Sequence, residues 1–255
     1  MKLFKYMFTL LVGTTLLLIS CRQTPSEKIS IAAAANMQLP MEAIAKRFTD
    51  KYQIPCELII GSYGKVTAQI VEGAPYDIFV AANMKYPEAV YNAGKAMARP
   101  EVYAHGKLVL WSMSLDTPVS INTLTETSIR HIAIANPKTA PYGLAALEVL
   151  HHYGLFAELE NKLVYGESIA QTDQFITSKA AQVGFTAMST VLSPRMKGKG
   201  HWMEIDAEKY APIGQGVVTL KRKGIEVQGV GEFYDFLFSD EAKEILKDFG
   251  YLMNE

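Results

Sequence analysis

Four short segments of the chain gather small and polar residues between a β-like apolar run and a helical repeat. They are AAAANM at 32–37, GSYGK at 61–65, NPKTAPYG at 136–143 and GESIAQ at 166–171. Ligands of open α/β sheets bind beyond the carboxyl ends of strands, so these are four equivalent places for a site. Most of the groups they offer are neutral hydrogen-bond donors, which can hold a small oxyanion without a counter-charge.

The first two segments offer donors of different kinds. Asn36 can donate from its side-chain amide beside free helix N–H groups, although Asn is also a common helix cap. Ser62 adds a hydroxyl to a turn that Gly61 and Gly64 make tight, and consecutive N–H groups at a helix start form an anion cradle. For a nucleotide phosphate loop the glycines are too close together, and Lys65 is not followed by Ser or Thr. The second segment therefore predicts a small anion and not a nucleotide.

The other two segments place donors at the start of later helices. Tyr142 can donate a phenol or a backbone hydrogen bond, or it can pack against a neighbouring helix. Ser168 or Glu167 is expected to cap the fourth helix. The backbone N–H groups of Ile169 and Ala170 would then remain available to a ligand.

The charge pattern excludes several other functions. The chain has 25 basic and 26 acidic residues and a net charge of −1, which gives no electrostatic footprint for nucleic acid. Lys65 and Lys138 are the only cations near the four segments, so selection would rest on cavity size and not on a flexible cation. Histidines and acids do not cluster there, and we expect neither a metal site nor a cofactor.

A secreted hydrolase or transferase is the alternative from a different class. The residues available for such chemistry are His105, His131, His151, His152, His201, Asp77 and Asp173. None of them lies in a nucleophile-elbow, His-Glu-x-x-His or paired-carboxylate context. A binding protein is therefore favoured over an enzyme.

The elements that position the four segments alternate between β and helical periods, which is typical of an α/β fold with a parallel sheet. Strands are predicted at 29–34, 57–60, 77–81, 107–111, 131–135, 162–165, 182–187 and 217–220. Met41, Ile44, Ala45 and Phe48 make one apolar helical stripe, and further helices follow the other three segments and fill the C-terminal region. The length suits one large domain or two lobes of roughly 100 residues each.

The N-terminus has the pattern of a secretory signal. Lys2 and Lys5 precede a run at 7–19 that is almost wholly apolar or small. This run is too short for a comfortable transmembrane helix. The pattern predicts a signal peptide over residues 1–20.

The signal ends in LISC at 18–21, which resembles a bacterial lipobox. We expect Cys21 to carry the lipid and residues 21–27 to form a polar tether. In the alternative interpretation the signal peptide is ordinary and this cysteine is incidental. Cys56 is the only other cysteine and is expected to be a buried thiol, without a disulfide.

In chain order, these segments resemble the molybdate-binding proteins of ABC transporters, within the type II periplasmic binding-protein superfamily. The matching stretches are AAAAN at 32–36, GSYGK at 61–65, QIVEGAPYDIFVAA at 69–82, GKLVLW at 106–111, AIANP at 133–137, APYG at 140–143, GESIAQ at 166–171 and VGF at 183–185. The resemblance covers residues 29–252, and the run EGAPYDIF with its flanks is its most specific part.

The resemblance implies an oxyanion site between two lobes. The donors it implies are Asn36 with Ala35, Ser62 with Tyr63, Tyr142, and Ile169. Many family members have Ser at the position of Asn36 and a Tyr close to Ala187. This chain lacks that Tyr, and Tyr142 would supply the phenol instead.

The implied fold is α/β with two lobes that close on the ligand like a hinge. Lobe I would hold residues 28–109 and 218–255, and lobe II residues 110–217. The β-like runs at 107–111 and 217–220 are the candidate hinge strands.

The predicted function is the extracytoplasmic capture of molybdate or tungstate by a monomeric lipoprotein that delivers the ion to an ABC-transporter permease. The lipid anchor would be its only link to the membrane, in the periplasm or at the outer cell surface. The same fold with sulfate, phosphate, thiosulfate or a small organic anion is the open alternative. Bonds to oxygen are longer in molybdate and tungstate than in sulfate, so a cavity built for them would bond sulfate loosely.

Overall fold

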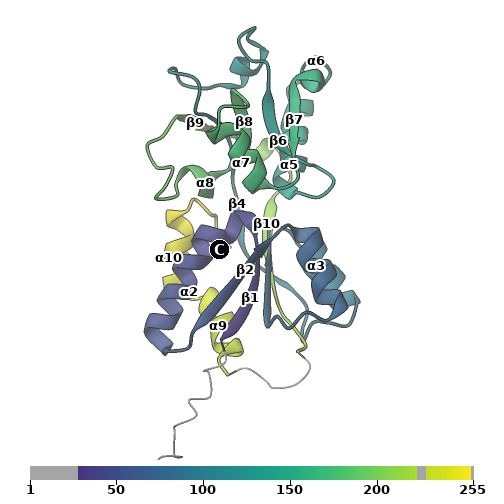
Figure 1. Ribbon diagram of the computed structural model, residues 1–255, viewed down its shortest axis with the longest axis vertical. Coiled ribbons are helices and arrows are strands. Elements are labelled where there is room, and N and C mark those ends of the chain that lie inside the picture. The colour runs from purple at the N-terminus through teal and green to yellow at the C-terminus, as the bar shows by residue number, and fades with distance from the viewer. Residues whose placement is uncertain (1–27, 223–227, 254–255) are drawn as a thin grey trace, which may run out of the picture.

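The computed structural model describes residues 28–222 and 228–253, which form two α/β lobes stacked end to end (Figure 1). Each lobe is built on one five-stranded mixed sheet. The predicted signal peptide at 1–20, Cys21 and the tether at 21–27 lie outside the described residues. Among the described helices, none has the length and apolar character needed to span a bilayer.

Lobe I has the strand order β2-β1-β3-β10-β4. Its strands are β1 (Ile29–Ala34), β2 (Cys56–Gly61), β3 (Ile78–Ala81), β4 (Glu101–Gly106) and β10 (Ile213–Thr219). The first three are parallel, and β10 runs antiparallel to both β3 and β4. Its helices are η1 (Ala35–Met37), α2 (Gln38–Tyr52), α3 (Tyr63–Glu72), α4 (Lys85–Asn92), α9 (Val230–Leu237) and α10 (Asp240–Asp248).

Lobe II has the strand order β7-β6-β8-β5-β9. Its strands are β5 (Leu108–Ser112), β6 (Ile132–Ala135), β7 (Leu163–Gly166), β8 (Val183–Ala187) and β9 (His201–Glu204). Strands β7, β6 and β8 are parallel, whereas β5 is antiparallel to both β8 and β9. Its helices are η2 (Ile121–Thr125), α5 (Pro141–His152), α6 (Phe156–Leu159), η3 (Glu160–Lys162), α7 (Ile169–Thr177), α8 (Met188–Val191) and η4 (Ala207–Lys209).

Helices pack on both faces of the lobe I sheet, and successive residues of its interior strand β1 point to these opposite faces and are almost all buried. The stripe predicted on α2 is buried, and Phe48 packs against Phe233 and Phe236 with ring centroids 5.0 and 5.6 Å apart. Full burial of such a side chain contributes about 1.5–3 kcal/mol. Cys56 lies in the edge strand β2, where it is free and only partly buried, and burial raises the pKa of its thiol to about 11.

The chain passes between the lobes at two places. Gly106 ends β4 in lobe I and Leu108 begins β5 in lobe II, so the first crossing is at Lys107. The second crossing lies between β9 and β10. The predicted boundaries at 109/110 and 217/218 therefore fall inside β5 and β10. At the first, β4 and β5 form a nearly continuous β-like run that hides the change of sheet. At the second, the predicted strand at 217–220 left out the start of β10 at 213–216. The two candidate hinge strands belong to different lobes.

Candidate functional site

The four predicted segments lie at helix N-termini that follow parallel strands of the two lobes, and they face the space between the lobes (Figure 1). The segments lead from β1, β2, β6 and β7 into η1 and α2, α3, α5 and α7. Ser62, Ala140 and Ser168 have extended backbone immediately before α3, α5 and α7. The first N–H groups of each helix have no intrahelical partner, which leaves them for capping groups or a ligand.

Asn36 lies at the centre of a buried hydrogen-bond network. It is 5% exposed, and its Nδ2 donates to Gln215 Oε1 at 2.8 Å and to the Tyr251 hydroxyl at 3.1 Å. The Tyr63 hydroxyl donates to Asn36 Oδ1 at 3.0 Å. Ser189 of α8 donates to the Asn36 carbonyl oxygen at 3.3 Å, so the network joins lobe I to lobe II. The side-chain N–H groups of Asn36, which the sequence offered to a ligand, are already engaged within the protein.

Ser62 and Ser168 occupy the same position before their helices but use their hydroxyls differently. Ser168 accepts a hydrogen bond from the Gln171 backbone N–H at 3.3 Å, as a helix cap does. The backbone N–H groups of Ile169 and Ala170 lie in the first turn of α7, where they have no intrahelical partner. The side chain of Ser62 makes no such bond to α3, so its half-buried hydroxyl is not used in capping.

The phenol of Tyr142 reaches across to the strands that join the lobes. Tyr142 is 1% exposed, and a Cβ atom at Gly106 would lie 2.1 Å from its hydroxyl oxygen. Burial raises the pKa of the Tyr63 and Tyr142 phenols well above the usual range, and that of Tyr251 to about 12. These phenols therefore stay protonated at neutral pH. The stretch VGFTA at 183–187 contains no tyrosine, and Tyr142 and Tyr251 bring phenols to this region instead.

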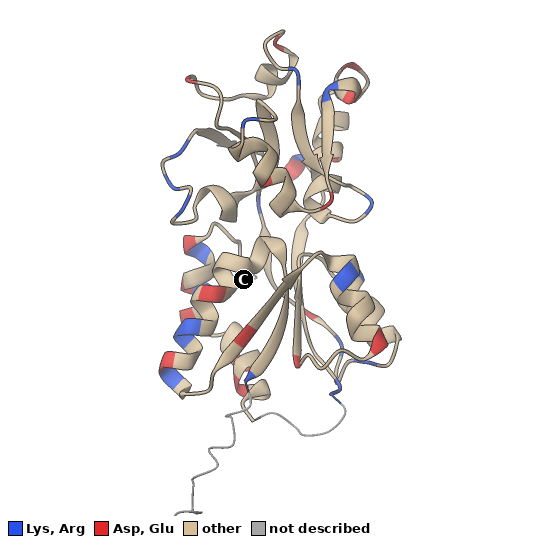
Figure 2. Cartoon of the chain, viewed as in Figure 1, with Lys and Arg blue, Asp and Glu red and all other residues tan. Residues whose placement is uncertain are grey.

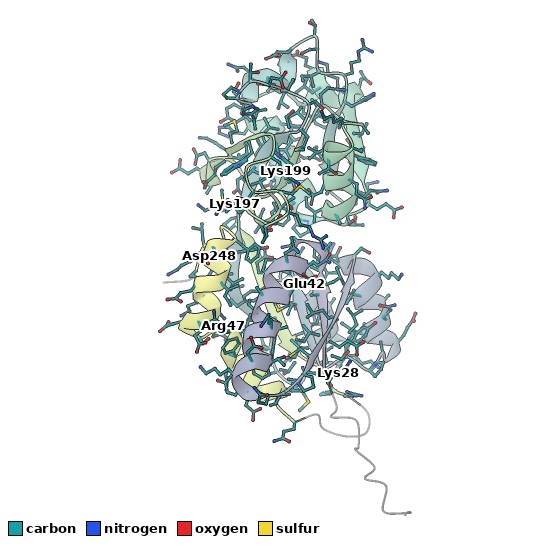
Figure 3. All side chains as sticks on the ribbon, turned by 60° about the vertical axis from the view of Figure 1, so that its left-hand side comes forward. Lys28, Glu42, Arg47, Lys197, Lys199 and Asp248 are labelled. Atoms are coloured by element: carbon teal, nitrogen blue, oxygen red, sulfur yellow. The ribbon has the colours of Figure 1, made fainter. Side chains whose placement is uncertain are left out.

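A cavity of about 210 Å³ opens between the lobes beside Asn36. Its lining comes from both lobes and includes Ala35, Asn36, Gln38, Ala170, Asp173, Ser189 and Arg195. The N-terminal turn of α7 therefore faces the first segment across the gap. In Figure 3, Lys197 and Lys199 of lobe II lie on one side of this gap, and Glu42 and Asp248 of lobe I lie on the other.

Two charged residues of opposite sign, Asp173 and Arg195, line the interlobe cavity, and Arg195 is a cation beyond the two that the sequence predicted near the segments. Lys65 and Lys138 are exposed, and the basic side chains are scattered over both lobes without forming one patch (Figure 2). Among the described residues, no cluster of three or more His, Cys, Asp or Glu side chains could hold a metal ion. An anion between the lobes would thus be held by N–H and hydroxyl groups.

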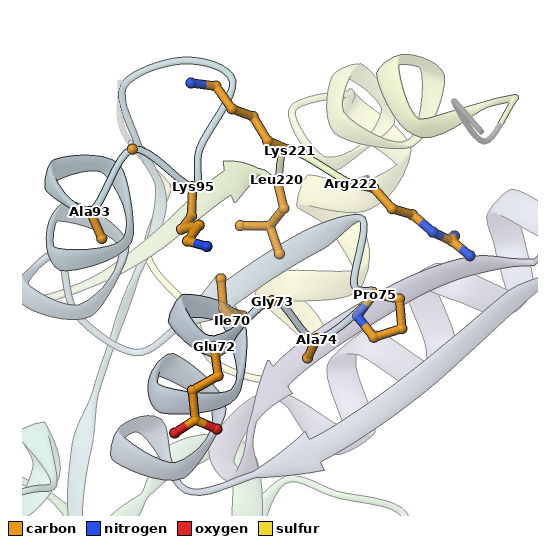
Figure 4. Close-up of a pocket in the computed structure, with 11 residues that line it drawn as sticks. Ile70, Glu72, Gly73, Ala74, Pro75, Ala93, Lys95, Leu220, Lys221 and Arg222 are labelled. Carbon is orange, nitrogen blue, oxygen red and sulfur yellow. The ribbon is translucent and has the colours of Figure 1, made fainter. Parts of the chain in front are cut away.

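A larger cavity of about 570 Å³ lies elsewhere in lobe I, where α3 and α4 end (Figure 4). Lys95, Lys221 and Arg222 line it, and Arg222 is paired with Asp77 at 3.1 Å. Helix C-termini carry partial negative charge, which disfavours an anion. The four segments, and not this larger cavity, form the candidate site.

The structure brings some of the predicted residues into direct contact. Asn36 and Tyr63 share a hydrogen bond, and Ala35 lines the interlobe cavity with the residue that follows Ile169. The sequence reasoning missed Gln215, Tyr251 and Ser189. Only Gln215 carried a usable signal, since it is a polar residue in the interior of the β-strand Ile213–Thr219.

Comparison with known proteins places this geometry in a family. A family model described as bacterial extracellular solute-binding protein matches residues 29–252. The molybdate-binding protein ModA of Rhodobacter capsulatus is 37% identical over 226 residues, 88% of each chain. ModA of Azotobacter vinelandii is 36% identical over 238 residues, 92% of this chain and 93% of that protein.

Solved structures agree with this assignment. The periplasmic molybdate-binding protein of Azotobacter vinelandii superposes with a TM-score of 0.83 at 34% identity, over 89% of this chain and all of that one. The sulfate-binding protein SubI of Mycobacterium tuberculosis, at 12% identity and a TM-score of 0.68, shares the fold alone. The relatives bear the name of the family that the motifs resembled, and they are binding proteins and not enzymes. The two-lobed α/β prediction is confirmed, and the chain belongs to the bacterial extracellular solute-binding protein family.

Proposed function

We propose that this protein captures molybdate or tungstate between its lobes and delivers it to the permease of an ABC transporter. The observation that carries the proposal is that four helix N-termini with neutral donors face the interlobe space, where the first and fourth segments line one cavity. Such groups stabilise a dianion without a counter-charge. The names of the two ModA relatives support molybdate as the ligand. Tungstate has the same charge and tetrahedral shape.

The proposed donors follow from their position at helix starts, where the first N–H groups have no intrahelical partner and the Ser62 side chain does not cap its helix. They are the backbone N–H groups of Ala35 and Asn36, the hydroxyl of Ser62 with the N–H of Tyr63, and the N–H groups of Tyr142 and Ile169. Backbone donors on rigid helix ends cannot move closer together when a smaller anion replaces molybdate. A cavity sized for molybdate would therefore hold sulfate with longer and weaker hydrogen bonds.

Isothermal titration of the soluble chain that begins after Cys21 tests the proposal. Molybdate and then tungstate are titrated, with sulfate and phosphate as competitors. We expect one-to-one binding of the metal oxyanions that excess sulfate does not displace. If sulfate or phosphate gives heat of binding and neither metal oxyanion does, molybdate and tungstate are refuted as ligands. The fold assignment is not affected by that result.

We also propose that the protein acts as a monomer held in the cell envelope by lipid on Cys21, in the periplasm or at the outer cell surface. The basic start, the apolar run and the LISC sequence at 18–21 support this location. In cells that express the full chain, Cys21→Ser should move the protein from the membrane fraction to the soluble fraction. Equal membrane association of both forms, with no lipid on the mature N-terminus by mass spectrometry, would refute the anchor.

A further inference from the structure

Residues 32–37 form the Asn36 segment, and its conformation is held by residues that are distant in sequence. The Asn36 carboxamide accepts a hydrogen bond from Tyr63 of α3. It donates to Gln215 of β10 and to Tyr251 near the C-terminus. Asn36 itself lies in the short helix η1, whose three residues cannot fix their own geometry by intrahelical bonds. The shape of this segment therefore depends on its partners.

Gln215 is oriented so that only its oxygen can face Asn36. Its side chain is fully buried, and its Nε2 donates to the Ile213 carbonyl oxygen at 2.8 Å. That bond fixes which end of the amide points away, so Oε1 accepts from Asn36. Gln215 also lies where the pairing of β10 with β4 shifts register before Gly216. It thus ties the Asn36 segment to a strand that follows an interlobe crossing.

Tyr251 contacts the same segment from the C-terminus and reaches the other lobe. Its hydroxyl lies 3.2 Å from the Asn36 carbonyl oxygen and 3.2 Å from Ser189 Oγ. The next residue, Leu252, is fixed to β4 by two backbone hydrogen bonds with His105, of 2.7 and 2.8 Å. The phenol is therefore anchored to lobe I while it bonds to α8 of lobe II.

We propose that Gln215 and Tyr251 are positioning residues for the oxyanion site, which hold the Asn36 segment in its ligand-binding conformation before the ligand arrives. The proposal rests on the proposed function. A donor that is already in place costs less ordering on binding, so affinity rises. Rigid donors also discriminate by anion size, because they do not follow a smaller ion.

The test compares Gln215→Met and Tyr251→Phe with a matched control, Tyr103→Phe, in the mature chain. Tyr103 is 3% exposed, and its hydroxyl has no hydrogen-bond partner among the described residues. Titration gives the Kd values for molybdate and sulfate. Loss of one or two such hydrogen bonds should weaken molybdate binding roughly tenfold. We expect a smaller change for sulfate, so the ratio of the two Kd values narrows.

A second readout needs no ligand. In nuclear magnetic resonance spectra, the carboxamide protons of Asn36 should exchange slowly with water in the wild type and in Tyr103→Phe. They should exchange faster in the other two variants. A positioning role predicts this change together with the loss of affinity, whereas a purely structural role would lower the melting temperature alone.

The outcomes separate the two proposals. A wild type that binds no oxyanion would refute the proposed function, and the positioning role with it, whatever the exchange data show. A wild type that binds molybdate, with unchanged affinity in both Gln215→Met and Tyr251→Phe, would overturn the positioning role alone. An equal loss of affinity in Tyr103→Phe would also overturn it.

Discussion

Asp173 should make the stability of this protein depend on pH. The side chain lies on α7 beside the interlobe cavity and accepts hydrogen bonds from Thr186 and, at 2.9 Å, from Thr190. Burial raises the pKa of its carboxyl group from 3.8 to about 7, and the two threonine hydroxyls oppose this rise. The folded protein therefore binds the Asp173 proton more tightly than the unfolded chain does.

The sign of the effect follows from this difference. The contribution of Asp173 to the free energy of unfolding is complete below about pH 4 and is lost as the pH rises through about 7. One pKa unit corresponds to about 1.4 kcal/mol, so a shift of this size sets an upper bound of ~4 kcal/mol. Asp173 is only partly buried, and solvent screening lowers the expected value to roughly 1–3 kcal/mol.

The variant Asp173→Asn removes the charge and keeps an oxygen that can accept from the threonines. Urea unfolding of both proteins between pH 4 and pH 8 gives the free energy of unfolding at each pH. The variant should gain on the wild type by roughly 1–3 kcal/mol between pH 4 and pH 7, and the difference should then level off. A difference that does not change with pH would refute the reasoning. Asp116→Asn, at an exposed aspartate, is the control for removing a carboxylate.

Three glycine and serine positions give further predictions. Ser62→Ala should weaken molybdate binding roughly tenfold and change the free energy of unfolding by less than about 0.5 kcal/mol, since its hydroxyl does not cap α3. Gly143→Ala should cost about 3 kcal/mol in urea unfolding, because its Cβ atom would lie 2.0 Å from the Ala135 carbonyl oxygen. Gly106→Ala should displace the Tyr142 ring, because its Cβ atom would lie 2.1 Å from the Tyr142 hydroxyl oxygen. The free energy of molybdate binding should change by more than the free energy of unfolding.

Matched glycines serve as controls for these variants. Gly64 lies in α3 with no atom within 4 Å of an added Cβ, so Gly64→Ala should be neutral or stabilising by up to about 1 kcal/mol. Gly214 lies in β10 opposite β4, and its nearest neighbours would be 3.5 Å away. Gly214→Ala should leave binding unchanged. If it reduces affinity as much as Gly106→Ala does, the contact with Tyr142 is not the cause. If Ser62→Ala binds molybdate as tightly as the wild type does, the Ser62 hydroxyl is not a donor to the ligand.

The helix starts of the candidate site could be predicted from the sequence because their signals are local. A β-like apolar run, a small or capping residue and a helical repeat follow one another within about ten residues. Ser168 illustrates this. The sequence predicts Ser168 or Glu167 as the cap of α7, and the Ser168 hydroxyl accepts a hydrogen bond from the backbone N–H of Gln171. Strand β1 has the predicted bounds for the same reason.

Two of the four described edge strands gave no such signal, whereas the edge strands β2 and β7 overlap predicted strands. Strands β4 and β9 were not predicted, and each lies at the edge of its sheet. Exposed and half-buried residues alternate along β9, which leaves no apolar run to detect. Strand β4 is followed almost directly by β5, so the change of lobe at Lys107 has no counterpart in the local pattern.

The network around Asn36 could not be read from the sequence for a deeper reason. Asn36 bonds to Gln215, which is 179 positions away in the sequence, and to Tyr251, which is 215 positions away. The sequence around Gln215 or Tyr251 does not indicate which residue it will contact. A backbone N–H at a helix start requires little of the residue that carries it, so the position of Asn36 can hold another residue while the donor stays. Precision must then come from what surrounds the segment. A site made of backbone donors is easy to locate from sequence, and under the proposed positioning role its selectivity depends on distant residues that hold those donors in place.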